Sequence, residues 1–124
     1  MPYERFRAWR ACHELAVCTY HATQSFPKTE LYGLTSQMRR AAFSAAANIA
    51  EGAAKKGSRE LRRYLDIALG SLSELTYFGL LARDLELLSR EQWETFNKSC
   101  DSAGKLTMAF YKAVSRGSVR KMAE

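Results

Sequence analysis

The chain has 124 residues, 47% of them hydrophobic, and its 19 Lys and Arg against 13 Asp and Glu give a formal net charge of +6. Two prolines and seven glycines provide too few turns for an all-β fold, and this length suits one domain. The apolar residues recur at helical spacing, and no apolar run reaches the roughly 18–20 residues of a membrane span, so we expect an all-α domain with no membrane partner.

The first predicted helix covers about residues 6–24. Its apolar side repeats at steps of three and four residues: Phe6, Trp9, Cys12, Ala16, Thr19, Thr23 and Phe26. It ends by Phe26, because Pro27 disfavours helical geometry in the residue before it. The N-terminus carries charges where a signal peptide has its apolar core, so we expect a cytoplasmic protein. Cys12, Cys18 and Cys100 are then free thiols.

The second predicted helix covers about residues 35–54, and Thr35 or Ser36 can cap its free amides. Most of its residues are apolar, but five polar side chains follow one another at steps of three and four: Gln37, Arg40, Ser44, Asn48 and Glu51. They fall inside an arc of roughly 80°. An unpaired buried polar group costs about 1–3 kcal/mol, so this stripe must meet polar partners.

The third predicted helix covers about residues 59–88, with Ser58 as its cap. Its apolar positions have a period of 3.5 residues: Leu61, Leu65, Ala68, Leu72, Leu75, Gly79 and Ala82. A second series lies beside the first: Tyr64, Ile67, Ser71, Glu74, Phe78, Leu81 and Leu85. Two adjacent series exceed what one antiparallel neighbour needs, and they indicate a subunit interface.

The fourth predicted helix covers about residues 90–116. Ser89 and Gln92 form a capping box, and Gly117 is a suitable stop. Its apolar side contains Trp93, Phe96, Cys100, Ala103, Thr107, Phe110 and Val114. Residues 118–124 are expected to be a frayed tail. Four helices joined by short turns predict a single antiparallel up-down-up-down four-helix bundle.

Polar residues of the second and third helices are complementary. Arg40 can lie opposite Glu74, Glu51 can pair with Arg62 or Arg63, and the neutral polar residues Ser44, Asn48 and Ser71 can fill the remaining hydrogen bonds. One interpretation is a buried network that fixes helix register or subunit pairing. A second is a pocket that binds a ligand or an RNA phosphate through Arg39 and Arg40. The third is partial exposure to solvent.

Catalytic and metal-binding patterns are weak. There is no Cys-x-x-Cys pair for zinc, neither His13 nor His21 follows a Glu by three residues as in di-iron bundles, and no Gly-rich phosphate loop is present. Glu51 and Glu74 remain as paired carboxylates for acid–base chemistry. We therefore expect no enzymatic activity, no metal and no cofactor.

The turn between the second and third helices holds the densest cluster of positive charge: Lys55, Lys56, Arg59, Arg62 and Arg63. It is the best candidate for contact with RNA or DNA, and the alternative is an ordinary solvated surface. Four cations near the C-terminus either complement a helix C-terminus or extend this basic surface: Lys112, Arg116, Arg120 and Lys121. Repeated around a ring of subunits, the turn would form a positive belt with high avidity.

Several segments resemble one family of four-helix bundle proteins, those encoded in intervening sequences of bacterial 23S ribosomal RNA genes. The segments are Phe26-Pro27, Tyr32-Gly33-Leu34, Ser36-Gln37-Met38-Arg39-Arg40-Ala41-Ala42, Asn48-Ile49-Ala50-Glu51-Gly52, Gly70-Ser71 and Glu74-Leu75. The resemblance implies a closed bundle, a ring-shaped homo-oligomer that is typically a pentamer, and no enzymatic activity. The architecture is similar to that of the diversity-generating retroelement accessory protein, which engages nucleic acid and a reverse transcriptase. We therefore expect RNA as the preferred ligand. The alternative is an oligomeric scaffold that binds a protein partner and no nucleic acid.

Overall fold

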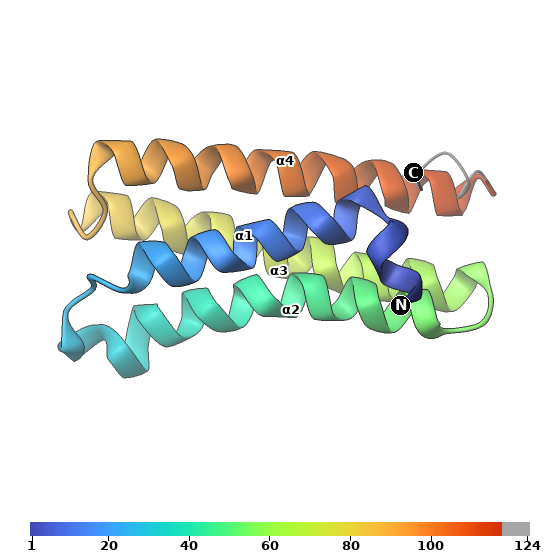
Figure 1. The fold of residues 1–124 in the computed structure, drawn as a ribbon, viewed down its shortest axis with the longest axis horizontal. Coiled ribbons are helices and arrows are strands. Elements are labelled where there is room, and N and C mark those ends of the chain that lie inside the picture. The colour runs from blue at the N-terminus through green and yellow to red at the C-terminus, as the bar shows by residue number, and fades with distance from the viewer. Residues whose placement is uncertain (118–124) are drawn as a thin grey trace.

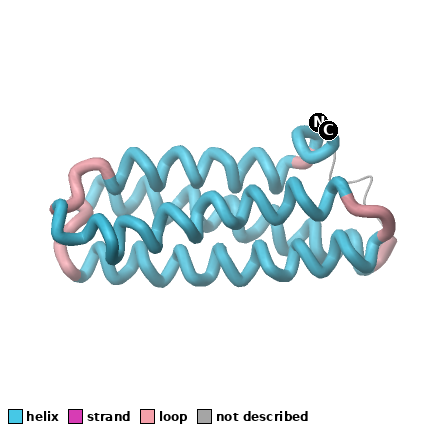
Figure 2. Tube along the Cα trace, turned by 90° about the horizontal axis from the view of Figure 1, so that it is seen from below, coloured by secondary structure: helices cyan, strands magenta, loops and turns pink. Residues whose placement is uncertain are grey.

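The computed structural model, which describes residues 1–117, is a four-helix bundle (Figure 1). Its helices are α1 (Arg7–Thr23), α2 (Ser36–Ala54), α3 (Ser58–Asp84) and α4 (Arg90–Ser115). Consecutive helices run in opposite directions and lie side by side along their length (Figures 1 and 2). In this arrangement α1 and α3 each pack against both α2 and α4. The predicted fold class is confirmed, and the predicted tail at 118–124 lies outside the described residues.

The core is built from the apolar series that the sequence predicts. Phe96 and Phe110 of α4 and Leu65 and Leu75 of α3 are almost completely buried. Leu15 of α1 is also fully buried, although the predicted series of the first helix did not include it. Members of the predicted series at the bundle edges are only partly buried: Trp9, Leu61 and Trp93. Apolar residues that repeat every 3.5 positions along a helix therefore lie on its side facing the interior of the bundle.

Small side chains bring α2 close to its neighbours. Ala41, Ala42 and Ala45 are fully buried on its inner side. Near the end of α2, a Cβ added to Gly52 would lie 2.8 Å from the Cβ of Tyr64 on α3, so only glycine fits there. The alanine-rich sequence of α2 therefore corresponds to close helix packing.

The start of α2 differs from the prediction. Thr35 occupies the N-cap position, but its side chain makes no cap hydrogen bond. The carboxylate of Glu30 instead accepts a hydrogen bond from the Leu34 amide over 3.3 Å, in a short turn that includes a kink at Gly33. The chain thus enters α2 through a π-helical turn, Leu31–Thr35, and needs no side-chain cap at Thr35 itself.

Helix α3 is shorter than predicted at its C-terminus. It ends at Asp84, and Glu86 follows with a φ of 60°, in the left-handed region. The Leu87 amide donates to the Ala82 carbonyl over 2.9 Å, which closes the helix end. This reversal leaves Leu88 buried against the core. The prediction of a helix to residue 88 was wrong because a glutamate, and no glycine, occupies the left-handed position.

The N-terminus of α3 also differs by one residue. Gly57, with a φ of 87°, is the N-cap residue, and Ser58 is the first residue of the helix.

By length and composition, α3 would suffice to cross a membrane, since an 18-residue window has a mean hydropathy of 1.2. In the bundle this helix packs against α2 and α4.

Candidate nucleic-acid interface

Positively charged side chains gather at one end of the bundle, which we call the basic end. The start of α1, the turn between α2 and α3, and the end of α4 meet there (Figure 1). The basic end contains Arg5, Arg7, Arg10, Lys55, Lys56, Arg59, Arg62, Arg63, Lys112 and Arg116. Because α3 begins where α2 ends and α4 returns to the same end, the up-down topology brings cations of α1, α3 and the end of α4 together with those of the α2–α3 turn.

The five cations predicted for nucleic-acid binding are all exposed. Arg63 forms an ion pair with Glu60 over 3.0 Å, and its guanidinium lies over the ring of Tyr64 at 4.6 Å. The Lys55 ammonium group also lies over the Tyr64 ring, 5.8 Å from its centroid. Within residues 1–117, no carboxylate forms an ion pair with the remaining three cations: Lys56, Arg59 and Arg62. The exposed turn therefore has positive charge available for a polyanion.

A shallow cleft of about 560 Å³ lies within the basic end, between the start of α3 and the end of α4. Arg59, Arg62 and Tyr111 line it, together with the acids Glu60 and Asp66. The hydrogen bond and charge of Arg63, with smaller contributions from Lys55 and Arg59, hold the pKa of Glu60 below its usual value. Glu60 therefore stays ionised and compensates part of the positive charge.

Arg5 and Arg7 belong to this end and were not identified from the sequence. Arg5 ends the short helical turn Pro2–Arg5 and Arg7 begins α1. The stretch is anchored because the Phe6 ring between them packs on that of Phe110 at 4.4 Å. The sequence did contain the signal, since an antiparallel bundle brings the first residues of its first helix next to the end of its second.

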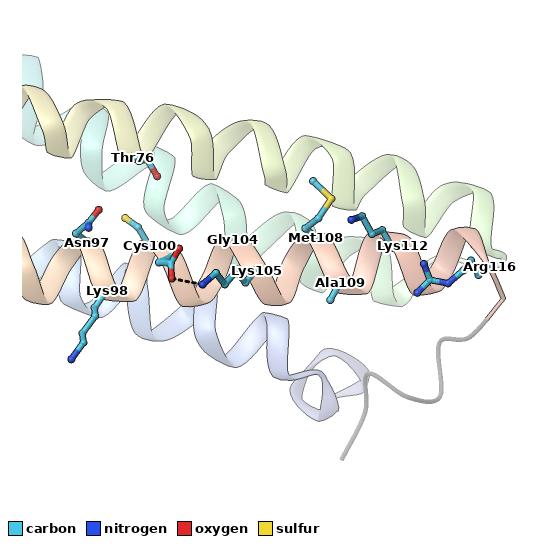
Figure 3. Close-up of a pocket in the computed structure, with 11 residues that line it drawn as sticks. Thr76, Asn97, Lys98, Cys100, Gly104, Lys105, Met108, Ala109, Lys112 and Arg116 are labelled. Carbon is cyan, nitrogen blue, oxygen red and sulfur yellow. Dashed lines mark ion pairs between the residues drawn. The ribbon is translucent and has the colours of Figure 1, made fainter.

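A longer groove of about 760 Å³ runs between α3 and α4 toward the basic end (Figure 3). Lys112 and Arg116 line its end, and Lys105 pairs with Asp101 over 3.0 Å, as the dashed line in Figure 3 marks. Lys98 points away from α3 in the same view. Both interpretations agree with this position, because Lys112 lies in the last turn of α4 and Lys112 and Arg116 both line the groove. Arg120 and Lys121 lie outside the described residues.

The predicted polar network joins α2 and α3. Arg40 donates to Gln37 over 2.9 Å and to Glu74 over 3.2 Å. The Ser44 hydroxyl lies 3.1 Å from that of Ser71, and Asn48 donates to the Ser44 carbonyl over 2.8 Å. The pairs expected from the sequence are thus adjacent in space.

Two details of this network differ from the expectation. Glu51 accepts a hydrogen bond from the Tyr64 hydroxyl over 3.0 Å and pairs with neither Arg62 nor Arg63, because Arg63 turns toward Glu60. The network is also not buried within one protomer, since the side chains of Arg40 and Glu74 remain 49% and 41% exposed. In the single chain, this exposure agrees with the third interpretation, partial exposure to solvent.

Chemically reactive groups are sparse in the described part of the chain. Burial raises the pKa of Cys12 to about 11 and that of Cys100 to about 12, against smaller lowering effects of their threonine hydrogen bonds. Such thiols are protonated and weakly nucleophilic at neutral pH. Within residues 1–117, no three His, Cys, Asp or Glu side chains lie close enough together to hold a metal ion.

The sequence family is decided by comparison with known proteins. Residues 4–109 match the family model described as 23S rRNA-intervening sequence protein. The chain belongs to this family. The resemblance noted in the sequence is thereby confirmed over most of the bundle.

A similar solved structure agrees with this family assignment. It is a protein of unknown function from the S23 ribosomal protein family of Bacteroides thetaiotaomicron, 25% identical, with a TM-score of 0.75. The match covers 85% of this chain and 98% of the other. No curated protein has a significant match to this sequence.

Proposed function

We propose that this family member is a non-catalytic, cytoplasmic RNA-binding protein that acts as a ring-shaped homo-oligomer, with five subunits as the expected number. The observation that carries the proposal is the basic end, where cations at the start of α1 and the end of α4 lie at the same end of the bundle as the exposed residues from Lys55 to Arg63. Phosphate groups bind such a surface with release of counterions, without any base-specific contact.

Self-association is supported by the exposed side of α3. In the second series of this helix, Ile67 is 41% exposed, and Tyr77 on a neighbouring part of the surface is 58% exposed. The half-exposed pair of Arg40 and Glu74 lies beside them on the α2–α3 surface. Apolar groups around a specific polar pair are typical of a protein interface. A ring would repeat the basic end and multiply its weak contacts.

The test measures binding of a fluorescein-labelled single-stranded RNA by anisotropy at low and moderate salt. A triple reversal, K55E/K56E/R59E, should abolish binding while circular dichroism and native mass spectrometry show an intact assembly. The control K28E/R90E/K98E makes the same change of net charge away from the basic end, and it should retain most of the affinity.

The competing function is a scaffold that binds a protein partner and no nucleic acid. Exposed aromatic and aliphatic side chains outside the basic end favour it, among them Tyr32, which is 92% exposed. Absent RNA binding by an intact oligomer, or equal losses in the two triple variants, would leave the scaffold as the remaining function.

A further inference from the structure

A second cleft lies at the opposite end of the bundle from the basic end. It has a volume of about 480 Å³ and is formed by the end of α1, the connecting turn and the start of α2. We call it the α1–α2 cleft. It is within the 300–1,000 Å³ typical of small-molecule sites. The basic end lies away from it, and Arg40 is the member of the polar network that lines it.

The polar side of the cleft is formed at the N-terminus of α2. Thr35 lines the cleft, is only 4% exposed, and its Oγ1 atom has no hydrogen-bond partner. Buried hydroxyl groups nearly always have a partner, so this one indicates a missing ligand or water. The N-terminus of a helix also carries partial positive charge, which favours an anion.

Arg39 adds a full positive charge to this side. Its Nε atom donates to the Thr23 hydroxyl over 2.9 Å, and its guanidinium lies over the Tyr20 ring at 4.7 Å. These two contacts fix the plane of the group. No carboxylate within residues 1–117 forms an ion pair with it. The Nη atoms of a fixed, unneutralised guanidinium are suited to bidentate binding of phosphate.

The other side of the cleft is aromatic and exposed. Tyr32 is 92% exposed, Phe43 49% and Tyr20 41%. Aromatic side chains this exposed are stacking surfaces for planar rings, and base–aromatic stacking tolerates any base. A simple anion site would not need them, and a purely apolar contact would leave the Arg39 charge uncompensated and the Thr35 hydroxyl without a partner.

We propose that the α1–α2 cleft binds a nucleotide, with its phosphate at Arg39 and Thr35 and its base against Tyr32 or Phe43. A nucleotide is the chemical class that combines an anion with a planar aromatic ring. The source is either a free nucleoside monophosphate or the 5′-terminal nucleotide of an RNA strand. The site goes beyond the proposed function, because it lies at the other end of the bundle and uses none of the residues of the basic turn.

The test uses the full-length protein and the fluorescent analogue MANT-AMP, displaced by AMP, adenosine or inorganic phosphate. We expect MANT-AMP to bind with a Kd below about 1 mM. AMP should displace it at least about tenfold better than either adenosine or phosphate, since each of these fills half of the site. Arg39→Gln and Tyr32→Ala should each weaken binding about tenfold or more.

Matched variants separate the cleft from general effects. Arg90→Gln removes an exposed arginine at the start of another helix and should leave binding unchanged. The K55E/K56E/R59E variant should also retain it, so failure of the RNA proposal and failure of this one give different results. No saturable MANT-AMP binding, or equal losses in R39Q and R90Q, would overturn the proposal.

Two RNA arms identify the source of the nucleotide. A ten-residue oligoadenylate with a 5′-phosphate is compared with the same strand lacking it, both as competitors of MANT-AMP in the K55E/K56E/R59E background. Stronger competition by the phosphorylated strand than by AMP assigns a strand end to the cleft. If the phosphorylated strand competes as well as AMP or less well, the cleft is assigned a free nucleotide. Competition that is the same with and without the 5′-phosphate, and stronger than that of AMP, would overturn the proposed phosphate contact.

Discussion

Arg40 on α2 donates from its Nη2 atom to both carboxylate oxygens of Glu74 on α3, over 3.2 and 3.3 Å. The two residues are far apart in the sequence, so the pair fixes how α2 and α3 align along the bundle. Both side chains are more than 40% exposed in the single chain. The energy of the pair therefore reports whether solvent or a second subunit surrounds it.

Glu74→Gln distinguishes these two environments. With Arg40 in solvent, the variant should lose about 1 kcal/mol or less of unfolding free energy, as surface ion pairs do. In an assembled ring, where a neighbour covers Arg40, the loss should reach about 3–5 kcal/mol. We expect the larger value from urea denaturation of the assembled protein. Glu94→Gln, which breaks the exposed pair with Arg90, is the control and should change little. A small loss in an assembly of proven size would remove Arg40 from the interface.

Two glycines of α3 should respond in opposite directions to alanine. Gly79 is buried against the ring of Phe96, and an added Cβ there would overlap ring atoms. Gly79→Ala should destabilise the protein by about 1–3 kcal/mol. An added Cβ at Gly70 meets nothing within 4 Å, so Gly70→Ala should stabilise by up to about 1 kcal/mol through helix propensity. Thermal denaturation measures both, and equal effects would contradict the packing described here.

The periodicity of the sequence was sufficient to predict the helices and the core because both depend on local spacing. Leu65 and Leu75 face the core as their positions require, and Ser89 and Gln92 exchange the expected hydrogen bonds over 3.1 and 2.8 Å. The end of α3 was missed because Glu86 adopts a left-handed conformation that is rare for a residue with a side chain.

The site was harder to predict than the fold, because its residues meet only through tertiary structure. The spacing of Arg40 and Glu74 gave their pairing but not their exposure, which depends on what covers the α2–α3 surface. Glu51 had two arginines nearby in sequence, and the closer partner in space is Tyr64. Arg5 joined the basic end only through the fold of the N-terminal turn.

The capping box at the start of α4 gives a local test of stability. Removal of the hydroxyl in Ser89→Ala leaves the Gln92 amide without its side-chain acceptor. The free energy of unfolding should fall by about 0.5–2 kcal/mol, which chemical denaturation can measure. Ser102→Ala, an exposed change inside the same helix, should be neutral or slightly stabilising. An equal loss in both would show that helix propensity, and not the cap, sets the effect.

Buried thiols should make the protein sensitive to alkali. The pKa values of Cys12 and Cys100 are raised to about 11 and about 12 in the folded state, chiefly by burial, whereas an unfolded thiol ionises near its usual value of about 8.5. Ionisation therefore favours the unfolded chain: stability is complete below about pH 8.5 and is lost as the pH rises through the folded values. Urea unfolding at about pH 7, 9 and 10.5 should show this decline.

Cys100→Ala provides the control for that decline, because other groups also titrate in alkali. The variant has a lower stability at every pH, but its free energy of unfolding should fall less steeply above about pH 9 than that of the unmodified protein. Cys18 is only half-buried, so at about pH 8 it should react with a thiol reagent before the other two cysteines. Parallel pH curves would assign the decline to groups other than Cys100.

Arg59 and Arg63 are neighbours in the basic turn, yet they should contribute differently to RNA binding. Arg63 is compensated by Glu60 over 3.0 Å, whereas no carboxylate in the described part of the chain pairs with Arg59. Each phosphate neutralised by a free cation adds about −0.7 to the slope of log K against log salt for single strands. Arg59→Ala should therefore reduce the slope by about 0.7 per engaged protomer. Arg63→Ala should reduce it less, because the Glu60 carboxylate already neutralises Arg63 and leaves it less free to neutralise a phosphate. Anisotropy titrations at four or more salt concentrations give both slopes.

Equal reductions would mean that RNA displaces Glu60 from Arg63, and an unchanged slope in both variants would place the RNA away from this turn.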